Sequence, residues 1–228
     1  MRVVVTRPEE DAGPLKAKLE ALGHEVILVP LLVIAPRAGV WIEALPWQAA
    51  VATSANAIRS LTGHDELKSL RILTVGPQSL QAAREAGFAK AEAHGGDVDG
   101  LVRHMRQTMR PSDGPILYLS GAETSSDLAG QLTAAGFDCR RVVIYDAVPA
   151  TGPGQAATTL TSADAVMLYS PRSARIWCGL VAEAAAPHYV CLSSNVAAVL
   201  PTTWKSHIAA APEESAMLAL LEQIQRTR

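Results

Sequence analysis

An internal repeat constrains the fold of this chain more than any other feature of its sequence. Four segments return once along the chain in unchanged order, at offsets that all lie between 113 and 117 residues. The pairs are 15–23 with 128–136, 53–57 with 169–173, 72–77 with 189–194, and 91–93 with 208–210. The first pair reads LKAKLEALG and LAGQLTAAG. A fixed period of this kind indicates two similar halves in which the same elements follow in the same order.

Short apolar runs alternate with longer helical patterns from end to end of the chain. Near-continuous apolar strands that are separated by helices are typical of parallel sheets covered on both faces. Three helical patterns end in glycine, at Gly23, Gly87 and Gly136, where a left-handed residue closes a helix. We therefore predict an α/β fold with two similar open parallel-sheet domains of the Rossmann or flavodoxin kind. The expected strands are Val3–Thr6, Val26–Pro30, Ala49–Ala52, Ile72–Val75, Ile116–Leu119, Val142–Tyr145, Ala165–Leu168, Tyr189–Leu192 and Ile208–Ala210.

Two segments rich in proline, glycine and alanine predict the domain boundaries. They read IAPRAG at 34–39 and AVPATGPG at 147–154, compositions that are typical of linkers. A simple division between the halves would fall near residues 110–114. Two linkers indicate instead that the chain leaves one domain, builds the second and returns. The expected domains are 1–34 with 150–228, and 38–146, with linkers near 35–37 and 147–149.

The composition argues against several partners and compartments. The 228 residues are 49% hydrophobic and 18% charged with a net charge of −2, and no basic run offers a surface for nucleic acid. No apolar run reaches the roughly 18–20 residues that span a bilayer, and the chain enters a strand too soon for a signal peptide. Cys139, Cys178 and Cys191 are expected as buried thiols in a reducing compartment, and the histidines show no metal-ligand spacing. We expect a cytoplasmic protein without a metal, membrane or nucleic-acid partner.

The common catalytic fingerprints are missing from the sequence. Val5-Thr6-Arg7-Pro8 follows the first strand, where a dinucleotide-binding chain would carry G-x-G-x-x-G. The chain also lacks G-x-x-x-x-G-K-[ST], H-E-x-x-H, C-x-x-C and G-x-S-x-G. These absences argue against a nucleotide-dependent enzyme, a zinc protease and the common serine hydrolases.

Small hydroxyl residues or glycine recur where strands pass into helices. In an open parallel sheet these carboxyl-end turns line the ligand crevice, and small side chains let an anion reach backbone N–H groups at positive helix ends. Six such turns suit a ligand with many carboxylates, with Arg7 and Arg172 as charge-assisted donors. The alternative is that the turns are ordinary helix caps and the arginines are solvated. The candidate substrate-binding residues are Thr6, Arg7, Thr53, Ser54, Gly76, Ser120, Gly121, Ser170, Arg172, Ser173 and Ser193.

Tyr145 is the candidate catalytic residue. It is one of four tyrosines and ends an apolar strand just before the second linker, at the expected edge of a cleft. A phenol at this position could donate a proton or a hydrogen bond to a ligand. A hydrogen-bonded structural tyrosine is an equally common alternative.

In their order and spacing, several short segments resemble the uroporphyrinogen-III synthase family. They are VTRP at 5–8, TSANA at 53–57, LYLSG at 117–121, VIY at 143–145, YSPRSA at 169–174 and CLSSNVA at 191–197. The resemblance covers essentially the whole chain, and it lies in the succession of these segments because no single motif is specific. Where many members carry Gly-Pro-Thr-Thr, this chain has Ser-Ser-Asn-Val at 193–196, so a hydroxyl contact is not carried over to Val196.

The resemblance implies two α/β domains joined by a two-stranded linker, with the active site in a cleft between them. It implies an enzyme that closes hydroxymethylbilane, a linear tetrapyrrole with eight carboxylates, to uroporphyrinogen III with loss of water and inversion of ring D through a spiro intermediate. It also implies that no metal or organic cofactor takes part, with Tyr145 as the cleft tyrosine and Ser170-Pro171 as the family's serine–proline turn. We expect a monomer that receives its substrate from hydroxymethylbilane synthase. The alternative is a two-lobed α/β protein that binds a small ligand without catalysis.

Overall fold

Runs of buried Val, Ile, Leu and Ala form the strands of the computed structural model, which describes residues 1–151, 162–181, 186 and 188–227. The glycines expected to close helices do so: Gly23, Gly87 and Gly136 have positive φ angles of 81°, 91° and 90°. Only glycine adopts this region at low cost, so each of these residues lets the chain turn from a helix into the next strand.

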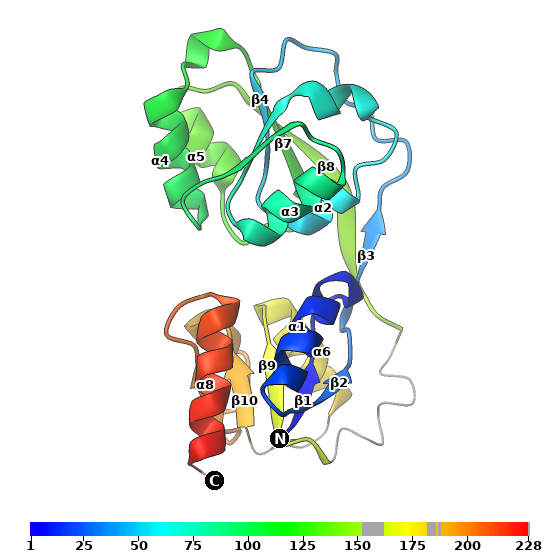
Figure 1. Ribbon diagram of the computed structural model, residues 1–228, viewed down its shortest axis with the longest axis vertical. Coiled ribbons are helices and arrows are strands. Elements are labelled where there is room, and N and C mark those ends of the chain that lie inside the picture. The colour runs from blue at the N-terminus through cyan, green and yellow to red at the C-terminus, as the bar shows by residue number, and fades with distance from the viewer. Residues whose placement is uncertain (152–161, 182–185, 187, 228) are drawn as a thin grey trace. The chain divides into compact units, whose positions relative to one another are not determined.

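The chain divides into two compact units. Unit 1 comprises Met1–Val33 and Val148–Arg228, and unit 2 comprises Ile34–Ala147. Figure 1 shows that unit 1 combines the blue N-terminal elements with the yellow-to-red C-terminal ones. The chain therefore begins in unit 1, builds unit 2 and returns.

Unit 1 contains a parallel sheet with the strand order β11-β10-β9-β1-β2. The strands are β1 (Arg2–Val5), β2 (Glu25–Leu28), β9 (Ala165–Leu168), β10 (His188–Cys191) and β11 (Ser206–Ile208). The helices are α1 (Glu9–Ala21), α6 (Pro171–Leu180), α7 (Ser194–Ala197) and α8 (Glu214–Arg226).

Unit 2 contains a sheet with the strand order β3-β8-β7-β4-β5-β6, in which β8 to β6 are parallel. The strands are β3 (Leu32–Pro36), β4 (Ala49–Ala52), β5 (Arg71–Thr74), β6 (Lys90–Ala93), β7 (Ile116–Gly121) and β8 (Cys139–Pro149). The helices are α2 (Ala55–Arg59), α3 (Pro77–Glu85), α4 (Val98–Thr108) and α5 (Leu128–Ala134), with short 3₁₀ turns at Asp65–Ser69 and Pro111–Asp113.

The internal repeat extends to the register of the two sheets. Val3 lies opposite Ala165 in unit 1, and Ile116 lies opposite Ala49 in unit 2, so the repeat partners stand 113 and 116 residues apart along the chain. Replacing every strand of unit 1 by its repeat partner gives β6-β5-β4-β7-β8, which is the order found in unit 2. Apart from β3, which has no repeat partner among the described strands, each unit therefore combines the first two strands of one repeat with the last three of the other. The prediction of two similar open parallel-sheet domains is confirmed.

The first residues of both segments expected as linkers belong to paired strands: β3 includes 34–36 and β8 includes 147–149. The N–H of Arg37 donates to Ile144 O at 2.9 Å, and that of Ala150 donates to Leu31 O at 3.0 Å. Residue numbers rise on one strand as they fall on the other, so β3 and β8 run antiparallel. Both strands end in proline, which lacks an N–H and is tolerated at strand ends. Gly152-Pro153-Gly154, the rest of the second expected linker, lies outside the described residues.

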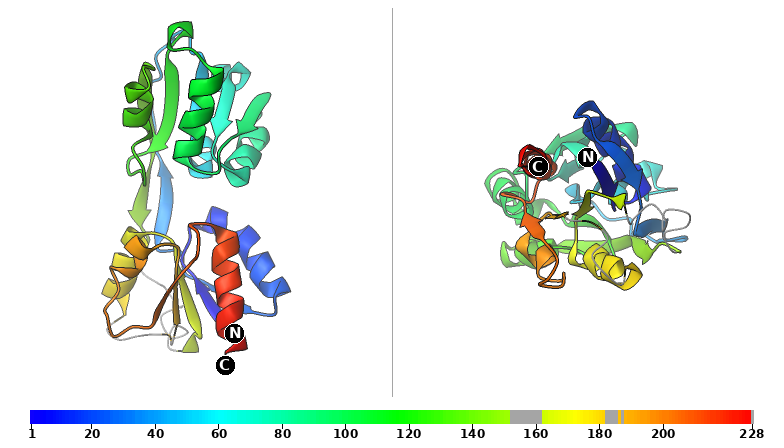
Figure 2. Two further views of the ribbon diagram at one scale, coloured as in Figure 1. Left: turned by 90° about the vertical axis from the view of Figure 1, so that its left-hand side faces the viewer. Right: turned by 90° about the horizontal axis from the view of Figure 1, so that it is seen from below.

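Helices cover both faces of each sheet, as expected for parallel strands (Figure 2). In unit 1, Trp177 of α6 packs on one face of the sheet, and Leu15 of α1 and Leu221 of α8 pack on the other. In unit 2, Ile58 of α2 lies on one face and Met105 of α4 on the other. All five side chains are at most 1% exposed. These layers leave the carboxyl edges of the strands free to carry loops and ligands.

Candidate functional site

A cavity of about 330 Å³ lies at the carboxyl edge of the unit 2 sheet. It is lined by the residues that follow β4 and β5, by the start of α4 and by the loop before α5, namely Thr53, Val75, Asp97, Val98, Asp99, Ser125 and Ser126. Thr53 was predicted from the sequence, and the two aspartates and two serines were not. Asp97 caps α4 by accepting a hydrogen bond from Gly100 N at 2.7 Å. The sequence signal that could have found this loop is Gly95-Gly96-Asp97, a turn followed by a helix cap just after segment 91–93, the repeat partner of an expected strand.

Two of the predicted substrate-binding residues, Ser54 and Gly121, contact the side chain of Tyr145. Its side chain is buried, and its hydroxyl lies 3.5 Å from Ser54 Oγ, a long contact between the two groups. The backbone of Gly121 packs against the ring so closely that a Cβ there would lie 2.5 Å from Tyr145 Cζ. The N–H of Ala122 donates to the carbonyl of Tyr145 at 2.9 Å. The structure thus brings together a phenol from within β8, a serine hydroxyl that follows β4 and the glycine at the end of β7. The sequence predicted that Tyr145 ends its strand, but β8 continues to Pro149 because it pairs with β3 there.

Arg141 is a neighbour of this group that the sequence did not reveal. Its Nε donates to Ser120 Oγ at 2.8 Å, and its Nη2 donates to the carbonyls of Gly121 at 2.7 Å and Ala122 at 2.8 Å. Ser120 therefore uses its hydroxyl within the protein. Nothing in the local sequence distinguishes Arg141 from Arg140, whose guanidinium pairs with Asp138 and Glu43.

Thr53 lies near a second tyrosine, Tyr118, on the opposite face of the unit 2 sheet from Tyr145. The Thr53 hydroxyl lies 3.5 Å from that of Tyr118, a buried residue of β7. Burial raises the pKa of the Tyr118 phenol, so this group stays neutral. Of the two residues only Thr53 lines the cavity, because Tyr118 is buried, and neither hydroxyl supplies a charge.

In unit 1, the hydroxyls of the predicted residues mostly serve the fold. Thr6 is buried and donates to Met167 O at 2.7 Å, which joins the ends of β1 and β9. Ser170 and Ser173 form a capping box at the start of α6: Ser173 N donates to Ser170 Oγ at 3.0 Å, and Ser170 N donates to Ser173 Oγ at 3.1 Å. Ser193 is the N-cap of α7, and its side chain makes no capping hydrogen bond.

The two predicted arginines of unit 1 differ in environment. Arg7 Nη1 lies 2.8 Å from Glu214 Oε2, and its guanidinium lies over the Tyr169 ring at 5.0 Å from the centroid. Burial raises the pKa of Tyr169, which keeps that phenol neutral. Arg172 lies partly exposed in the first turn of α6.

Gly76, in unit 2, caps α3 with extended backbone and has open space beside its Cα. The roles of all these residues in substrate binding stay predictions.

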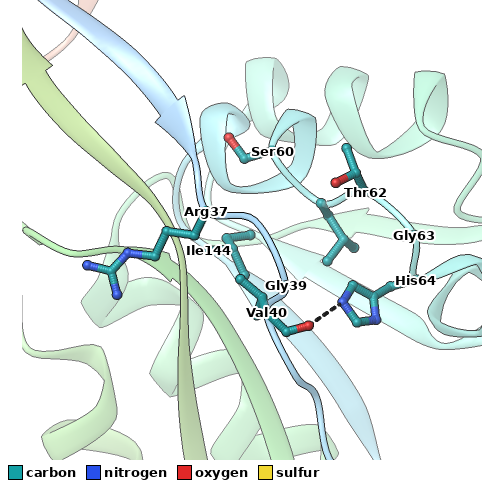
Figure 3. A pocket seen from close by; sticks show the side chains of 9 residues that line it. Arg37, Gly39, Val40, Ser60, Thr62, Gly63, His64 and Ile144 are labelled. Atoms are coloured by element: carbon teal, nitrogen blue, oxygen red, sulfur yellow. Dashed lines mark hydrogen bonds between the residues drawn. The ribbon is translucent and has the colours of Figure 1, made fainter.

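A second cavity in unit 2, of about 240 Å³, contains none of the predicted residues. Figure 3 shows Arg37 and His64 on opposite sides of it. Arg37 forms a two-bond pair with Asp146 at 2.7 and 2.8 Å. His64 lies 3.1 Å from both Val40 O and Glu66 Oε1. Arg37 and His64 thus both have partners within the protein.

One group among the described residues has the composition of a metal site. The ligand atoms of Glu92, His94 and His104 lie within 4.8 Å of one another. However, Arg71 binds both carboxylate oxygens of Glu92 at 2.8 and 2.9 Å and, together with His94, lowers the pKa of that carboxyl to about 2. The two imidazoles stack at 3.4 Å with 9° between their planes. Each imidazole nitrogen directs its lone pair within its own ring plane, so parallel stacked rings cannot both point at one ion. In this arrangement the group is a hydrogen-bonded stack.

Among the described residues, no helix is both long enough and apolar enough to cross a membrane.

The comparisons with known proteins identify the family. The family model of uroporphyrinogen-III synthase HemD matches residues 13–219. No curated protein sequence matches the chain. Uroporphyrinogen-III synthetase from Helicobacter pylori 26695 has a similar structure, with a TM-score of 0.69 and 16% identity over 98% of this chain and 100% of that one.

A mutant uroporphyrinogen III synthase from the extremely thermophilic bacterium Thermus thermophilus gives a TM-score of 0.54 and 14% identity over the full length of both chains. At such identities the two structures establish the fold, and the family model establishes the family. The chain belongs to the uroporphyrinogen-III synthase family, the cyclising lyases of tetrapyrrole biosynthesis.

Proposed function

We propose that this chain closes hydroxymethylbilane to uroporphyrinogen III, with loss of water and inversion of ring D, as a step of haem biosynthesis. The match of the family model over residues 13–219 carries this proposal. The same match does not favour the alternative of a two-lobed binding protein without catalysis. The arrangement around Tyr145 supports the chemistry, because it places a phenol hydroxyl beside Ser54 near the carboxyl ends of β4 and β7.

The reaction needs a proton at the hydroxymethyl end of the linear substrate. It also needs ring D, at the other end, to attack through its substituted carbon. The C–O bond of the hydroxymethyl group breaks as a proton is supplied to its oxygen, and water leaves. The substituted carbon of ring D attacks the carbon that has lost its hydroxyl, which gives the spiro intermediate. This intermediate fragments and closes again with ring D inverted, and loss of the ring proton restores the pyrrole and returns one proton. Substrate and products therefore differ only by the water released.

Tyr145 is the proposed acid at the departing hydroxyl. A phenol donates a hydrogen bond or a proton from its neutral form. Ser54 Oγ, 3.5 Å from the phenol oxygen, can orient the phenol or hold the departing water. A correctly positioned acid contributes roughly 10²–10⁴-fold to a rate.

Most of the remaining catalysis is positioning. Unassisted closure of a flexible bilane joins the unsubstituted carbon and gives the type I isomer, so the enzyme must hold one curled conformation, and such pre-orientation has large effects on rate. Thr6, Ser120, Ser170 and Ser173 use their hydroxyls within the protein. Backbone N–H groups at the turns, with Arg172, are therefore the proposed donors to the acetate and propionate groups.

The proposal is tested by the isomer that the protein forms. Purified protein with a chelator and no added cofactor should convert freshly generated hydroxymethylbilane mainly to the type III isomer. Heat-denatured protein is the control and should give type I. Type I product at micromolar native protein would show that the chain does not catalyse the inversion, and a requirement for added metal or nucleotide would contradict the cofactor-free mechanism.

Three further features belong to this proposal. The protein acts as a monomer in the cytoplasm and receives hydroxymethylbilane from hydroxymethylbilane synthase. Light scattering from a purified sample should give the mass of one 24.1 kDa chain. In a coupled assay, hand-over predicts less type I by-product than the same flux of free hydroxymethylbilane gives. Equal by-product in the two assays would mean that the substrate passes through bulk solution.

A further inference from the structure

The side chain of Tyr145 faces Ser54 because β8 contains one extra residue. Along β7 and β8, Leu119 pairs with Val142 and Ser120 with Val143, but Gly121 pairs with Tyr145, which leaves Ile144 without a partner on β7. Side chains alternate between the two faces of a strand. In an unbroken ladder Tyr145 would therefore share a face with Arg141 and Val143. The extra residue moves it to the opposite face, where it packs with Leu119 and Ile144. Bulges of this kind re-aim side chains next to active sites.

Arg141 hydrogen-bonds residues 120–122, the segment at the end of β7 that lies opposite the bulge, from the other face of the sheet. A single guanidinium donates to three consecutive residues, Ser120, Gly121 and Ala122. Two of these three residues contact Tyr145 directly: Gly121 packs on its ring, and Ala122 N donates to its carbonyl. The planar guanidinium presents its donors in a fixed fork, which a lysine cannot reproduce.

From this geometry we infer that Arg141 is a positioning residue for Tyr145: by fixing the 120–122 turn, it fixes the location of the phenol that acts in the proposed reaction. The inference rests on the proposed function for its catalytic part. It predicts that Arg141 contributes to the rate only through Tyr145 and does not bind substrate itself.

Replacement of Arg141 tests this role. Arg141→Met keeps much of the side-chain length and removes all donors. We expect kcat to fall roughly 10–100-fold, as for a misplacement of about 1 Å, with KM nearly unchanged and a larger share of type I product. Arg141→Lys should retain more of kcat than Arg141→Met. The matched control is Arg140→Met, which removes the neighbouring exposed arginine and its pairs with Asp138 and Glu43 and should leave kcat unchanged.

A double variant separates positioning from an independent contribution. If Arg141 acts through Tyr145, Arg141→Met combined with Tyr145→Phe should be no slower than Tyr145→Phe alone. Losses that multiply in the double variant, or a KM that rises in Arg141→Met with kcat intact, would overturn the inference.

Gly121→Ala perturbs the same contact from the opposite side. The added Cβ would lie 2.5 Å from Tyr145 Cζ and 2.8 Å from its hydroxyl oxygen, so the ring must move although Arg141 is intact. It should lower kcat as Arg141→Met does. Gly13→Ala, at a position with open space around it, should keep wild-type kcat. Wild-type kcat in Gly121→Ala would show that the location of the ring does not limit the rate.

A spectroscopic measurement tests, without any activity assay, whether Arg141 fixes the location of the Tyr145 ring. With ¹³C-labelled tyrosine rings, one of four signals disappears in Tyr145→Phe and is thereby assigned. This signal should shift in Arg141→Met and not in Arg140→Met. An unshifted signal would overturn the inference. A wild-type protein that makes no type III isomer would overturn the proposed function instead, and the ring signal would then decide alone whether Arg141 positions Tyr145.

Discussion

At the scale of single residues, the Tyr145 hydroxyl separates the catalytic from the structural interpretation of the site. If it supplies the proton, Tyr145→Phe should lower kcat by roughly 10–10⁴-fold. KM should change little because other groups hold the carboxylates, and slower enzyme loses more substrate to spontaneous type I closure. Tyr118→Phe is the matched control: it removes a buried phenol that also lies 3.5 Å from a hydroxyl, and it should turn over normally. A structural Tyr145 predicts normal turnover with a stability loss of about 1 kcal/mol.

The buried side chain of His24 should make the free energy of unfolding depend on pH. It is buried, and neither ring nitrogen has a hydrogen-bond partner among the described residues. Burial is the main cause that lowers its pKa below the ordinary value of 6.5. Below pH 6.5, His24 binds a proton in the unfolded chain but stays neutral in the folded protein until the pH reaches its lowered pKa. The stability from neutral His24 is therefore complete above pH 6.5 and is lost as the pH falls toward the lowered folded pKa.

The variant His24→Leu has no such titration. Its melting temperature relative to wild type should rise as the pH is lowered from about 8 to about 5, because only the wild type loses stability through this proton. Thermal unfolding of both proteins at the two pH values gives the comparison. A difference that does not change with pH would show that His24 stays unprotonated in the unfolded chain too, or protonates freely in the folded one.

At the scale of elements, the helix caps distinguish the structural from the binding interpretation of the serine turns. Ser170 bonds to the backbone of α6 through its side chain, whereas Ser193 makes no such bond at α7. Ser170→Ala should cost about 1 kcal/mol of unfolding free energy, the usual cost of a lost cap, and Ser193→Ala much less. Denaturant unfolding of both variants tests this. Equal stability losses would contradict the capping assignment, and a KM raised by either variant would show that its hydroxyl also reaches the substrate.

At the scale of the whole molecule, the repeats and the compact units do not coincide. Apart from β3, each repeat contributes two strands to one unit and three to the other, so a cut near residue 112 separates strands that pair with one another. Unit 2 is a continuous segment, Ile34–Ala147, with apolar cores on both faces of its sheet. We expect this segment to fold alone with a cooperative transition, because a domain with its own core can do so.

The fragments 1–112 and 113–228 should not fold by themselves. In 1–112, β4 lacks β7 and β1 lacks β9, so strands that are central in the sheets become exposed edges. Circular dichroism and thermal melting of the three fragments make the test. Cooperative unfolding of 113–228 alone, with Ile34–Ala147 unfolded, would show that the repeats and not the compact units are the folding domains.

The sequence by itself determined most of the strands, the glycine helix ends and the pairing of the repeats, because these depend on local signals. It missed β3 and β6 and ended β8 too early. Apolar runs such as Ala165–Leu168 are buried on both faces and need no tertiary information to be recognised. Gly23 and Gly136 mark helix ends through a conformation that other residues avoid. Ser54 was also found in this way, as a polar residue at a strand end, whereas Tyr145 was expected at such an end but lies within β8. The roles of both residues stay predictions.

Only the tertiary structure decided which of these residues meet and which way they point. Tyr145 reaches Ser54, 91 positions away in sequence, through a bulge of one residue that no local pattern encodes. The same holds for Arg141, which is identical in type to its neighbour Arg140 but lies on the face where Ser120 and the 120–122 turn are within reach. The physical reason is that parallel strands pair across long stretches of chain, and a shift of one residue in their register turns a side chain to the opposite face of the sheet.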